Sequence, residues 1–243
     1  NVRWKVKLPG HGSGTPIIWD DRIFLQTAIP TTDARPMLTE GGGGPPTVRP
    51  AGPIRFTLLC LDRKTGKTVW QRAAREEVPH EGHHPDHGYS SQSAVTDGKH
   101  VYAYFGSRGL YCYDLDGNLK WSRSLGKMRT RNGFGEGSTP ALHGNTLVIT
   151  WDHEGDDFIV ALDKNTGKEL WRRQRDEPTT WATPLIIPHG DRVQVVAPGT
   201  NAVRSYDLAT GEQLWECAGL TANVIPTPVT GNGMVYVTSG FRG

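Results

Sequence analysis

The sequence is poor in the features that mark several common protein classes. Its 243 residues contain three cysteines, with no adjacent pair and no Cys-x-x-Cys motif, which excludes a disulfide scaffold and a zinc site built on such pairs. No apolar run approaches the length of a membrane-spanning helix, so we expect no transmembrane segment. The formal net charge is only +2, and we therefore expect no nucleic-acid partner.

Long amphipathic helical patterns are also missing, whereas Gly (30) and Pro (17) are plentiful. Short β-branched or aromatic runs alternate with turn signals such as Asp97-Gly98 and Gly190-Asp191. This combination is typical of many short strands joined by tight turns. The sequence therefore predicts an all-β fold.

An internal repeat organises most of the chain. Four segments carry an Asp, a turn Gly and a Trp in the same register: Asp62, Gly66 and Trp70; Asp114, Gly117 and Trp121; Asp163, Gly167 and Trp171; Asp207, Gly211 and Trp215. A second marker, usually Thr-Pro, precedes each unit, as at Thr139-Pro140 and Thr183-Pro184. Tandem four-stranded units of about 40–50 residues are the blades of a β-propeller.

The Asp-x-x-Thr-Gly-Lys-x-x-Trp unit resembles the tryptophan-docking repeat of the quinoprotein-like (PQQ-like) propeller superfamily. The sequence is more similar to the secreted members and to the outer-membrane assembly lipoprotein than to the PQQ alcohol dehydrogenases. The resemblance implies a propeller, usually of eight blades, and a periplasmic or secreted location. About four to five blades are present, so we expect part of an eight-bladed ring. A five-bladed closure is the alternative.

The repeats predict the domain organisation of a single partial propeller. We expect an isolated outer strand (1–10), four blades (11–75 with an inserted loop at 29–55, 88–125, 134–175 and 179–218) and an incomplete blade (223–243). Missing blades or a partner should cover the open edge, because bare strand edges invite aggregation.

The repeat positions predict which side chains are structural. Trp4, Trp70, Trp121, Trp171 and Trp215 are expected to be buried between blades, since each ring removes a large apolar area from water. Cys60 and Cys112 stand two residues before a repeat Asp, where other units have Ala161 and Ser205. We therefore expect both thiols to be buried and reduced.

Strand parity selects one face of the blades as the candidate binding face. In an up-and-down blade, the connections from second to third strand and from each blade to the next lie on the same side. These connections contain the insertion and every unusual loop, and loops on a rigid scaffold commonly carry function. We expect His83, His84, His87, His153 and Glu136 on this face.

Histidines are concentrated between His80 and His87. Imidazoles and carboxylates are suitable ligands for transition metals. His83, His84 and His87 are therefore candidate metal ligands, with a solvated polar loop as the alternative.

Other polar residues of this face are candidates for catalysis or ligand binding. His153, Asp152 and Glu136 are catalytic candidates, because a neighbouring carboxylate tunes His near neutral pH. The candidate ligand-binding residues, for an anion, a sugar or a ring, are Arg108, Arg129, Arg131, Asn132, Trp181 and Arg242. The alternative for the arginines is pairing with Glu136, Asp152 or Glu154.

The cofactor question stays open at this point. Quinoprotein dehydrogenases hold PQQ between a Trp and a vicinal cysteine disulfide, and this sequence lacks such a pair. PQQ is thus implied by the resemblance only, and a metal is the other cofactor considered. The leading hypothesis is an extracytoplasmic propeller that binds a protein or carbohydrate ligand at its loop-rich face. The alternative is an enzyme on that face, either a PQQ-linked oxidoreductase or a metal-assisted hydrolase or lyase acting on carbohydrate.

Overall fold

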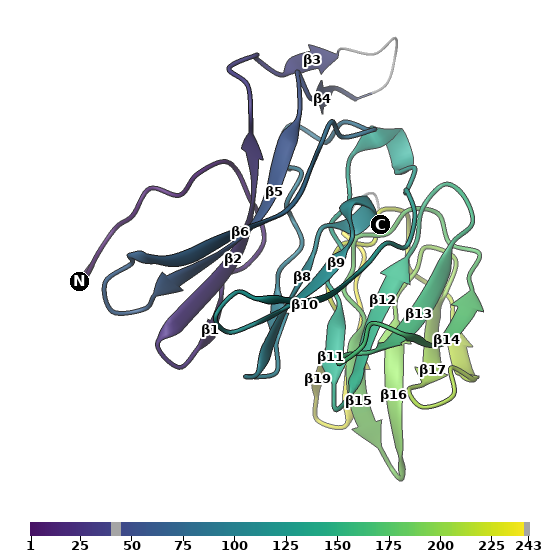
Figure 1. Ribbon diagram of the computed structural model, residues 1–243. Coiled ribbons are helices and arrows are strands. Elements are labelled where there is room, and N and C mark those ends of the chain that lie inside the picture. Colours follow the sequence, from purple (N-terminus) through teal and green to yellow (C-terminus); the bar gives the residue numbers. More distant parts are fainter. Residues whose placement is uncertain (40–44, 241–243) are drawn as a thin grey trace. The chain divides into compact units, whose positions relative to one another are not determined.

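The computed structural model describes residues 1–39 and 45–240. The chain divides into two compact units, Asn1–Gly137 (unit 1) and Ser138–Gly243 (unit 2). Nearly all regular structure is β-strand (Figure 1). Within the described ranges the helical segments are two short 3-10 turns, η1 (Gly106–Arg108) and η2 (Arg131–Gly133).

Unit 1 contains two four-stranded antiparallel sheets and a separate hairpin. The first sheet has the order β1-β2-β5-β6: β1 (Ile17–Trp19), β2 (Arg22–Pro30), β5 (Ile54–Asp62) and β6 (Thr68–Glu77). The second has the order β7-β8-β9-β10: β7 (Val95–Thr96), β8 (His100–Tyr104), β9 (Leu110–Asp114) and β10 (Leu119–Arg123). The hairpin pairs β3 (Met37–Thr39) with β4 (Thr47–Arg49).

Unit 2 repeats the same sheet order twice and ends in a two-stranded sheet. The third sheet contains β11 (Ala141–His143), β12 (Thr146–Trp151), β13 (Phe158–Asp163) and β14 (Glu169–Gln174). The fourth contains β15 (Leu185–His189), β16 (Arg192–Ala197), β17 (Val203–Asp207) and β18 (Gln213–Cys217). The last pair among the described residues is β19 (Val229–Gly231) and β20 (Met234–Tyr236).

The repeat Asp residues build the turns between the third and fourth strands. Asp62 Oδ1 accepts hydrogen bonds from the backbone N–H and hydroxyl of Thr65, at 2.8 and 2.7 Å. These bonds hold the pKa of Asp62 below its usual value, because they favour the ionised form. Asp163 and Asp207 make the same contacts. A local side-chain signal thus forms the turn without help from the rest of the fold.

The core of each unit lies between its two complete sheets. In unit 1, Phe56 of the first sheet meets Phe105 beside the second, with ring centroids 5.7 Å apart. In unit 2, Val148 and Ile159 are fully buried against Val195 of the neighbouring sheet. The central strands contain nearly continuous apolar runs because both of their faces are covered.

The cysteine predictions are confirmed. Cys60 and Cys112 are buried free thiols on β5 and β9, and each stands opposite the repeat Trp of the next strand, Trp70 and Trp121 respectively. A small residue at this position leaves room for the ring. Burial raises the pKa of Cys60 to about 11 and that of Cys112 to about 12.

The tryptophan prediction is confirmed only in part. Trp70 and Trp171 are 8% and 7% exposed, and Trp121 is half-buried. Trp215 is 38% exposed, so the expectation that it is buried was wrong. The ring is covered in other repeats by the turn of the repeat that follows, and the described residues contain no such turn after β20.

Two other expectations are corrected by the strand assignments. The segment 1–10, expected as an isolated strand, has no regular strand; half-buried Trp4 is held by its Nε1–H donating to the carbonyl of Arg63. The insertion at 29–55 is not simply a loop, since β2 continues to Pro30, β5 begins at Ile54, and the β3–β4 hairpin lies between them. In the part of the chain that is described, no helix is long and apolar enough to cross a membrane.

Candidate functional site

The connections of unit 1 meet one another, as strand parity predicts. The segment 80–87, here called the histidine loop, contacts both the β3–β4 hairpin and the segment 128–136. His83 exchanges two backbone hydrogen bonds with Val48 of β4, at 2.8 and 3.0 Å. The N–H of His84 donates to the carbonyl of Phe134 at 3.0 Å. Figure 1 shows the hairpin beyond the ends of β2 and β5.

Side chains strengthen the contact between the histidine loop and segment 128–136. The Glu81 carboxylate accepts the backbone N–H and the hydroxyl of Thr130, both at 2.9 Å to Oε2. His80 Nε2 lies 2.7 Å from the carbonyl of Met128. The histidine loop is therefore a bonded part of the unit rather than a solvated loop.

The three candidate metal ligands have other partners. Nδ1 of His83 lies 2.8 Å from the carbonyl of His84, and Nδ1 of His84 accepts from the backbone N–H of Asp86 at 3.2 Å. Nδ1 of His87 bonds to the hydroxyl of Ser91. Over the described residues, no group of three or more His, Cys, Asp or Glu side chains is arranged to hold a metal ion. The geometry gives the metal hypothesis no support.

Burial changes the charge state of this loop. The pKa of His83 is lowered by burial, and burial together with His83 and His84 lowers the pKa of His87 to about 4. Both imidazoles are consequently neutral near pH 7. The loop carries less positive charge than its composition indicates.

Arg108 and Glu136 form a buried ion pair instead of an open site. Arg108 Nη1 lies 2.9 Å from Glu136 Oε1, and both side chains are 5% exposed. Glu136 also accepts the backbone N–H and hydroxyl of Ser107, each at 2.6 Å. Arg108 Nε lies 3.7 Å from Glu77 Oε1. Arg108 therefore has the pairing with Glu136 that was the alternative, and an anion-binding role for it stays a prediction.

The close approach of Glu136 requires a glycine. Gly106 has a φ of +59°, and a Cβ on it would stand 1.6 Å from Glu136 Oε2. Beside the ion pair, a cavity of about 10 Å³ is bordered by Tyr89 and Arg108. Such a volume accepts about one water molecule and no substrate. Ser107 and Glu77 were missed by sequence reasoning, because no spacing rule joins them to Glu136.

Unit 2 contains a comparable buried pair. Arg175 donates to Asp152 through Nε at 2.7 Å and Nη2 at 3.2 Å, and both side chains are fully buried. The hydroxyl of Thr180 donates to Asp152 at 2.7 Å. Burial raises the pKa of Asp152, while the attraction of Asp152 outweighs burial and raises the pKa of Arg175. Arg175 was missed by the sequence analysis, and it makes Asp152 a structural carboxylate.

His153 and Glu154 follow Asp152 in the chain and have contacts of their own. His153 is 8% exposed, and its ring stands edge-on to Trp151 with centroids 6.2 Å apart. Glu154 accepts the hydroxyl of Thr179 at 3.0 Å. That His153 shares a face with the histidine loop stays a prediction.

The remaining ligand-binding candidates differ in exposure. Arg129 and Asn132 are exposed, and Arg131 is half-buried. Half-buried Trp181 donates its backbone N–H to the carbonyl of Val224 at 2.9 Å. Arg242 lies outside the described residues. Their ligand-binding roles stay predictions.

The quinone site implied by the resemblance does not fit the residues present. Cys60 and Cys112 are buried on separate strands, and Cys217 is exposed on β18. None of them can form a vicinal disulfide, because no two cysteines are adjacent in the sequence. No quinone chemistry is assigned to this chain.

The family described as "Outer membrane protein assembly factor BamB" matches residues 1–155 and 155–242. The chain belongs to this family. Its membership in the BamB family agrees with the four sheets of identical strand order and confirms the all-β propeller fold class, with four four-stranded blades and one two-stranded sheet among the described residues.

Two curated relatives align with parts of this BamB-family chain. BamB of Francisella salina is 31% identical over 100 residues, 41% of this chain and 18% of that protein. Lanthanide-dependent methanol dehydrogenase of Methylacidiphilum fumariolicum (strain SolV) is 37% identical over 82 residues, 30% of this chain and 12% of that protein. The chain thus spans less than a fifth of each relative's length.

Solved structures show the same fold. Quinohemoprotein alcohol dehydrogenase from Comamonas testosteroni has a TM-score of 0.53 at 12% identity, over 94% of this chain and 39% of that one. At this identity the likeness shows the fold alone. The BamB family and the dehydrogenases share blades, whereas the chemistry of a dehydrogenase depends on site residues.

Proposed function

We propose that this chain is an extracytoplasmic binding scaffold that holds an extended segment of a protein partner along β3. The observation that carries the proposal is the free outer edge of the β3–β4 hairpin. Met37 and Leu38 of β3 are 61% and 55% exposed. Among the described residues β3 pairs with β4 alone.

Backbone geometry gives the direction of that edge. The backbone N–H and C=O of Val48 both form hydrogen bonds with the backbone of His83. In an antiparallel pair, both groups of a residue point to the same side. Leu38 is opposite Val48 and therefore directs its own N–H and C=O away from β4. An extended peptide can add to this edge by main-chain hydrogen bonds.

The hairpin is held firmly enough to act as a template. The bridge between Val48 and His83 fastens one of its edges to the histidine loop, and the hydroxyls of Thr39 and Thr47 lie 2.8 Å apart across it. A partner strand then adds to a surface that is already ordered, which lowers the entropic cost of binding.

The family description supports the kind of partner and its place. It names outer membrane protein assembly, which favours a protein ligand and a periplasmic or secreted location. The two sheets of unit 1, with one projecting hairpin, are suited to presenting such an edge.

Binding can be measured directly with a fluorescein-labelled peptide of about ten alternating Val and Thr residues, the length of a long strand. Leu38→Pro removes the outward N–H and no hydrogen bond to β4, so the hairpin should persist while affinity falls at least about tenfold. Leu38→Val, which keeps the N–H, should bind like the parent. Equal binding by Leu38→Pro would contradict the proposal, provided its far-ultraviolet circular dichroism is unchanged.

A further inference from the structure

The β3–β4 hairpin has two faces of different chemistry. Residues that stand directly opposite each other in an antiparallel pair direct their side chains to the same face. Leu38 pairs with Val48, and Val48 pairs in turn with His83. Their three side chains therefore form one row across the hairpin and the histidine loop. The neighbours of Leu38 in β3 direct their side chains to the opposite face.

Tyr89 fixes this row to unit 1. Its ring stands edge-on to the imidazole of His83, with centroids 4.6 Å apart, and packs against the buried core of the unit. Nδ1 of His83 lies 2.8 Å from the carbonyl of His84, so this nitrogen is paired within the loop. Val48, His83 and Tyr89 are half-buried, whereas Leu38 is 55% exposed. The row, here called the Leu38 row, thus ends at an exposed leucine.

The opposite face of the hairpin is more polar. Thr39 and Thr47 stand opposite each other, and their hydroxyls lie 2.8 Å apart. Met37 stands opposite Arg49, and both side chains are exposed. A side chain added on this face would therefore meet hydroxyls and a cation beside one methionine.

Prolines limit the main-chain bonds that the hairpin can offer. Pro36 precedes β3 and Pro50 follows β4, so the two stand where the next pair of the ladder would be. Proline has no N–H to donate. Bonding directions alternate along an antiparallel strand, so within β3 only Leu38 directs both main-chain groups outward. A strand that adds to β3 makes its main-chain bonds with that one residue.

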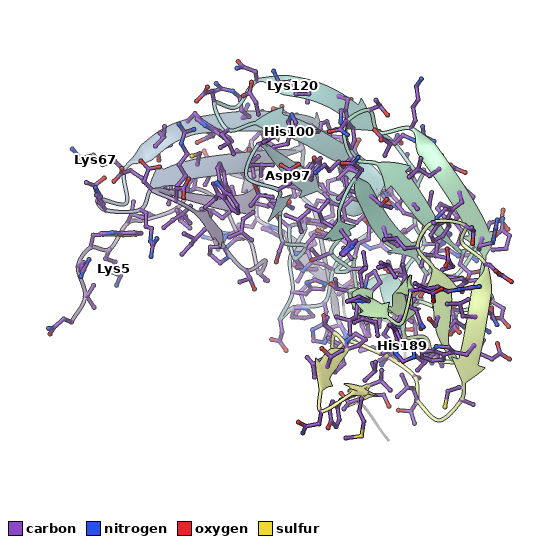
Figure 2. All side chains as sticks on the ribbon, turned by 90° about the horizontal axis from the view of Figure 1, so that it is seen from below. Lys5, Lys67, Asp97, His100, Lys120 and His189 are labelled. Carbon is purple, nitrogen blue, oxygen red and sulfur yellow. The ribbon has the colours of Figure 1, made fainter. Side chains whose placement is uncertain are left out.

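The turn between β7 and β8 shows how unit 1 closes an ordinary hairpin. Asp97 Oδ1 accepts the backbone N–H groups of Lys99 and His100, at 2.9 and 2.7 Å. Figure 2 shows Asp97 and His100 next to each other at this turn. Such a turn uses its polar groups internally. The described part of the β3–β4 hairpin instead directs the main-chain groups of Leu38 outward.

We propose that the partner segment carries one large apolar or aromatic side chain opposite Leu38, and that Leu38 selects it. The residue opposite Leu38 directs its side chain to the face of the Leu38 row. There it covers the exposed leucine and extends the row by one residue. The inference rests on the proposed function, because it specifies which segments bind at β3.

Burial of apolar area supports this choice of partner. Leu38 is exposed over more than half of its surface, although it continues a row whose other members are half-buried. Covering Leu38 removes apolar area of both strands from water, which is the main favourable contribution where main-chain bonds are few. A large ring buries the most area for two rotatable bonds. The partner therefore needs one anchor side chain rather than a long matching strand.

Met37 exposes a similar fraction, 61%, and is still the weaker contact. It stands at the end of β3, next to Pro36, and its own row continues to the charged Arg49. Methionine also loses more rotamer freedom than leucine when a partner fixes it. Leu38 and Met37 thus form a matched pair of exposed side chains, one on each face.

The test compares two fluorescein-labelled peptides of about ten residues, the length of a long strand. A central Phe in one and a central Thr in the other stand in the same host sequence of Thr and Ser. Each peptide is titrated into the full chain to about 1 mM and followed by anisotropy. The Thr peptide measures what the main chain contributes. We expect the Phe peptide to bind at least about fivefold more tightly.

Two variants of the chain locate the contact. In Leu38→Ala the preference for Phe should fall to about twofold or less, because the anchor loses its partner. The Thr peptide should bind this variant as it binds the parent, which shows that the edge is intact. Met37→Ala removes a similarly exposed side chain from the opposite face and should keep the full preference.

Three results would overturn the inference. Equal binding of the Phe and Thr peptides by the parent would do so and leave the proposed function standing, because main-chain addition would then be sufficient. Loss of the preference in Met37→Ala, with the preference kept in Leu38→Ala, would place the anchor on the other face. Absence of binding by both peptides would overturn the proposed function as well.

Discussion

Gly211 lies directly beneath the indole ring of Trp171, and a Cβ on that glycine would stand 2.6 Å from the ring. Its φ of +71° also disfavours any side chain. This contact combines a turn requirement with a packing requirement at one residue. The two can be separated because Gly144 has a similar φ of +55° and nothing within 4 Å of its Cβ position.

We predict that Gly211→Ala lowers the free energy of unfolding by about 2–4 kcal/mol, the sum of backbone strain and overpacking. Gly144→Ala should cost only about 1 kcal/mol, because strain acts there alone. Urea unfolding followed by fluorescence measures both. Equal losses would mean that the contact with Trp171 contributes nothing.

The buried pair of Asp152 and Arg175 should be expensive to break. Asp152→Ala leaves a fully buried guanidinium without its carboxylate, and we expect a loss of about 3–5 kcal/mol in the free energy of unfolding. Glu169→Ala removes the partner of Arg172 in a pair whose side chains are about a third exposed, and should cost about 0.5 kcal/mol or less. A large loss for Glu169→Ala together with a small one for Asp152→Ala would contradict the assignment.

Stability should fall in acid through His87. Its pKa is about 4 in the folded chain against 6.5 for the free group, so between these values the unfolded chain binds a proton that the folded chain does not. The stabilisation is complete above pH 6.5 and is lost as pH falls toward 4. His87→Gln should remove up to about 3 kcal/mol of this pH dependence.

Denaturant unfolding at several pH values measures that change. His143→Gln is the control, because His143 is exposed at the end of β11. If the free energy of unfolding changes with pH between 6.5 and 4 by the same amount in the parent and in His87→Gln, burial of the His87 imidazole is not responsible for the loss of stability in acid.

Thiol reactivity should separate the three cysteines. Cys60 and Cys112 are buried, and burial raises their pKa values to about 11 and about 12, whereas Cys217 is exposed. A thiol-specific reagent at about pH 8 should therefore modify Cys217 alone in the folded chain. All three should react in denaturant. Fast modification of Cys60 or Cys112 before unfolding would show that the blade core is open.

The parts of the fold that the sequence predicts depend on contacts between residues that are close in the chain or on one pair of strands. The Asp62 turn is built from side-chain contacts three residues apart, and small residues such as Ala161 stand opposite the repeat Trp in the next strand. Such features depend on neighbours in sequence or on one strand pair. The blade order and the buried state of Cys60 and Cys112 follow from them.

The candidate site was less predictable. Glu136 reaches Arg108 across 28 positions and Arg175 reaches Asp152 across 23, and no period in the sequence marks either distance. Composition makes His83 a candidate metal ligand, with a solvated loop as the alternative, because it shows only that the imidazoles are close in sequence. Its pairing with Val48 depends on the hairpin inside the insertion.

By itself the sequence determined the strand order of the blades, their turns and the docking positions of the tryptophans, because those depend on short-range patterns that repeat along the chain. Only the tertiary structure decided which charged side chains form buried ion pairs, how the histidine loop pairs with β4, and that Trp215 is exposed. Each of these depends on what a connection or a following repeat places against the residue, and burial of a charge or a ring is a property of that contact rather than of the residue itself.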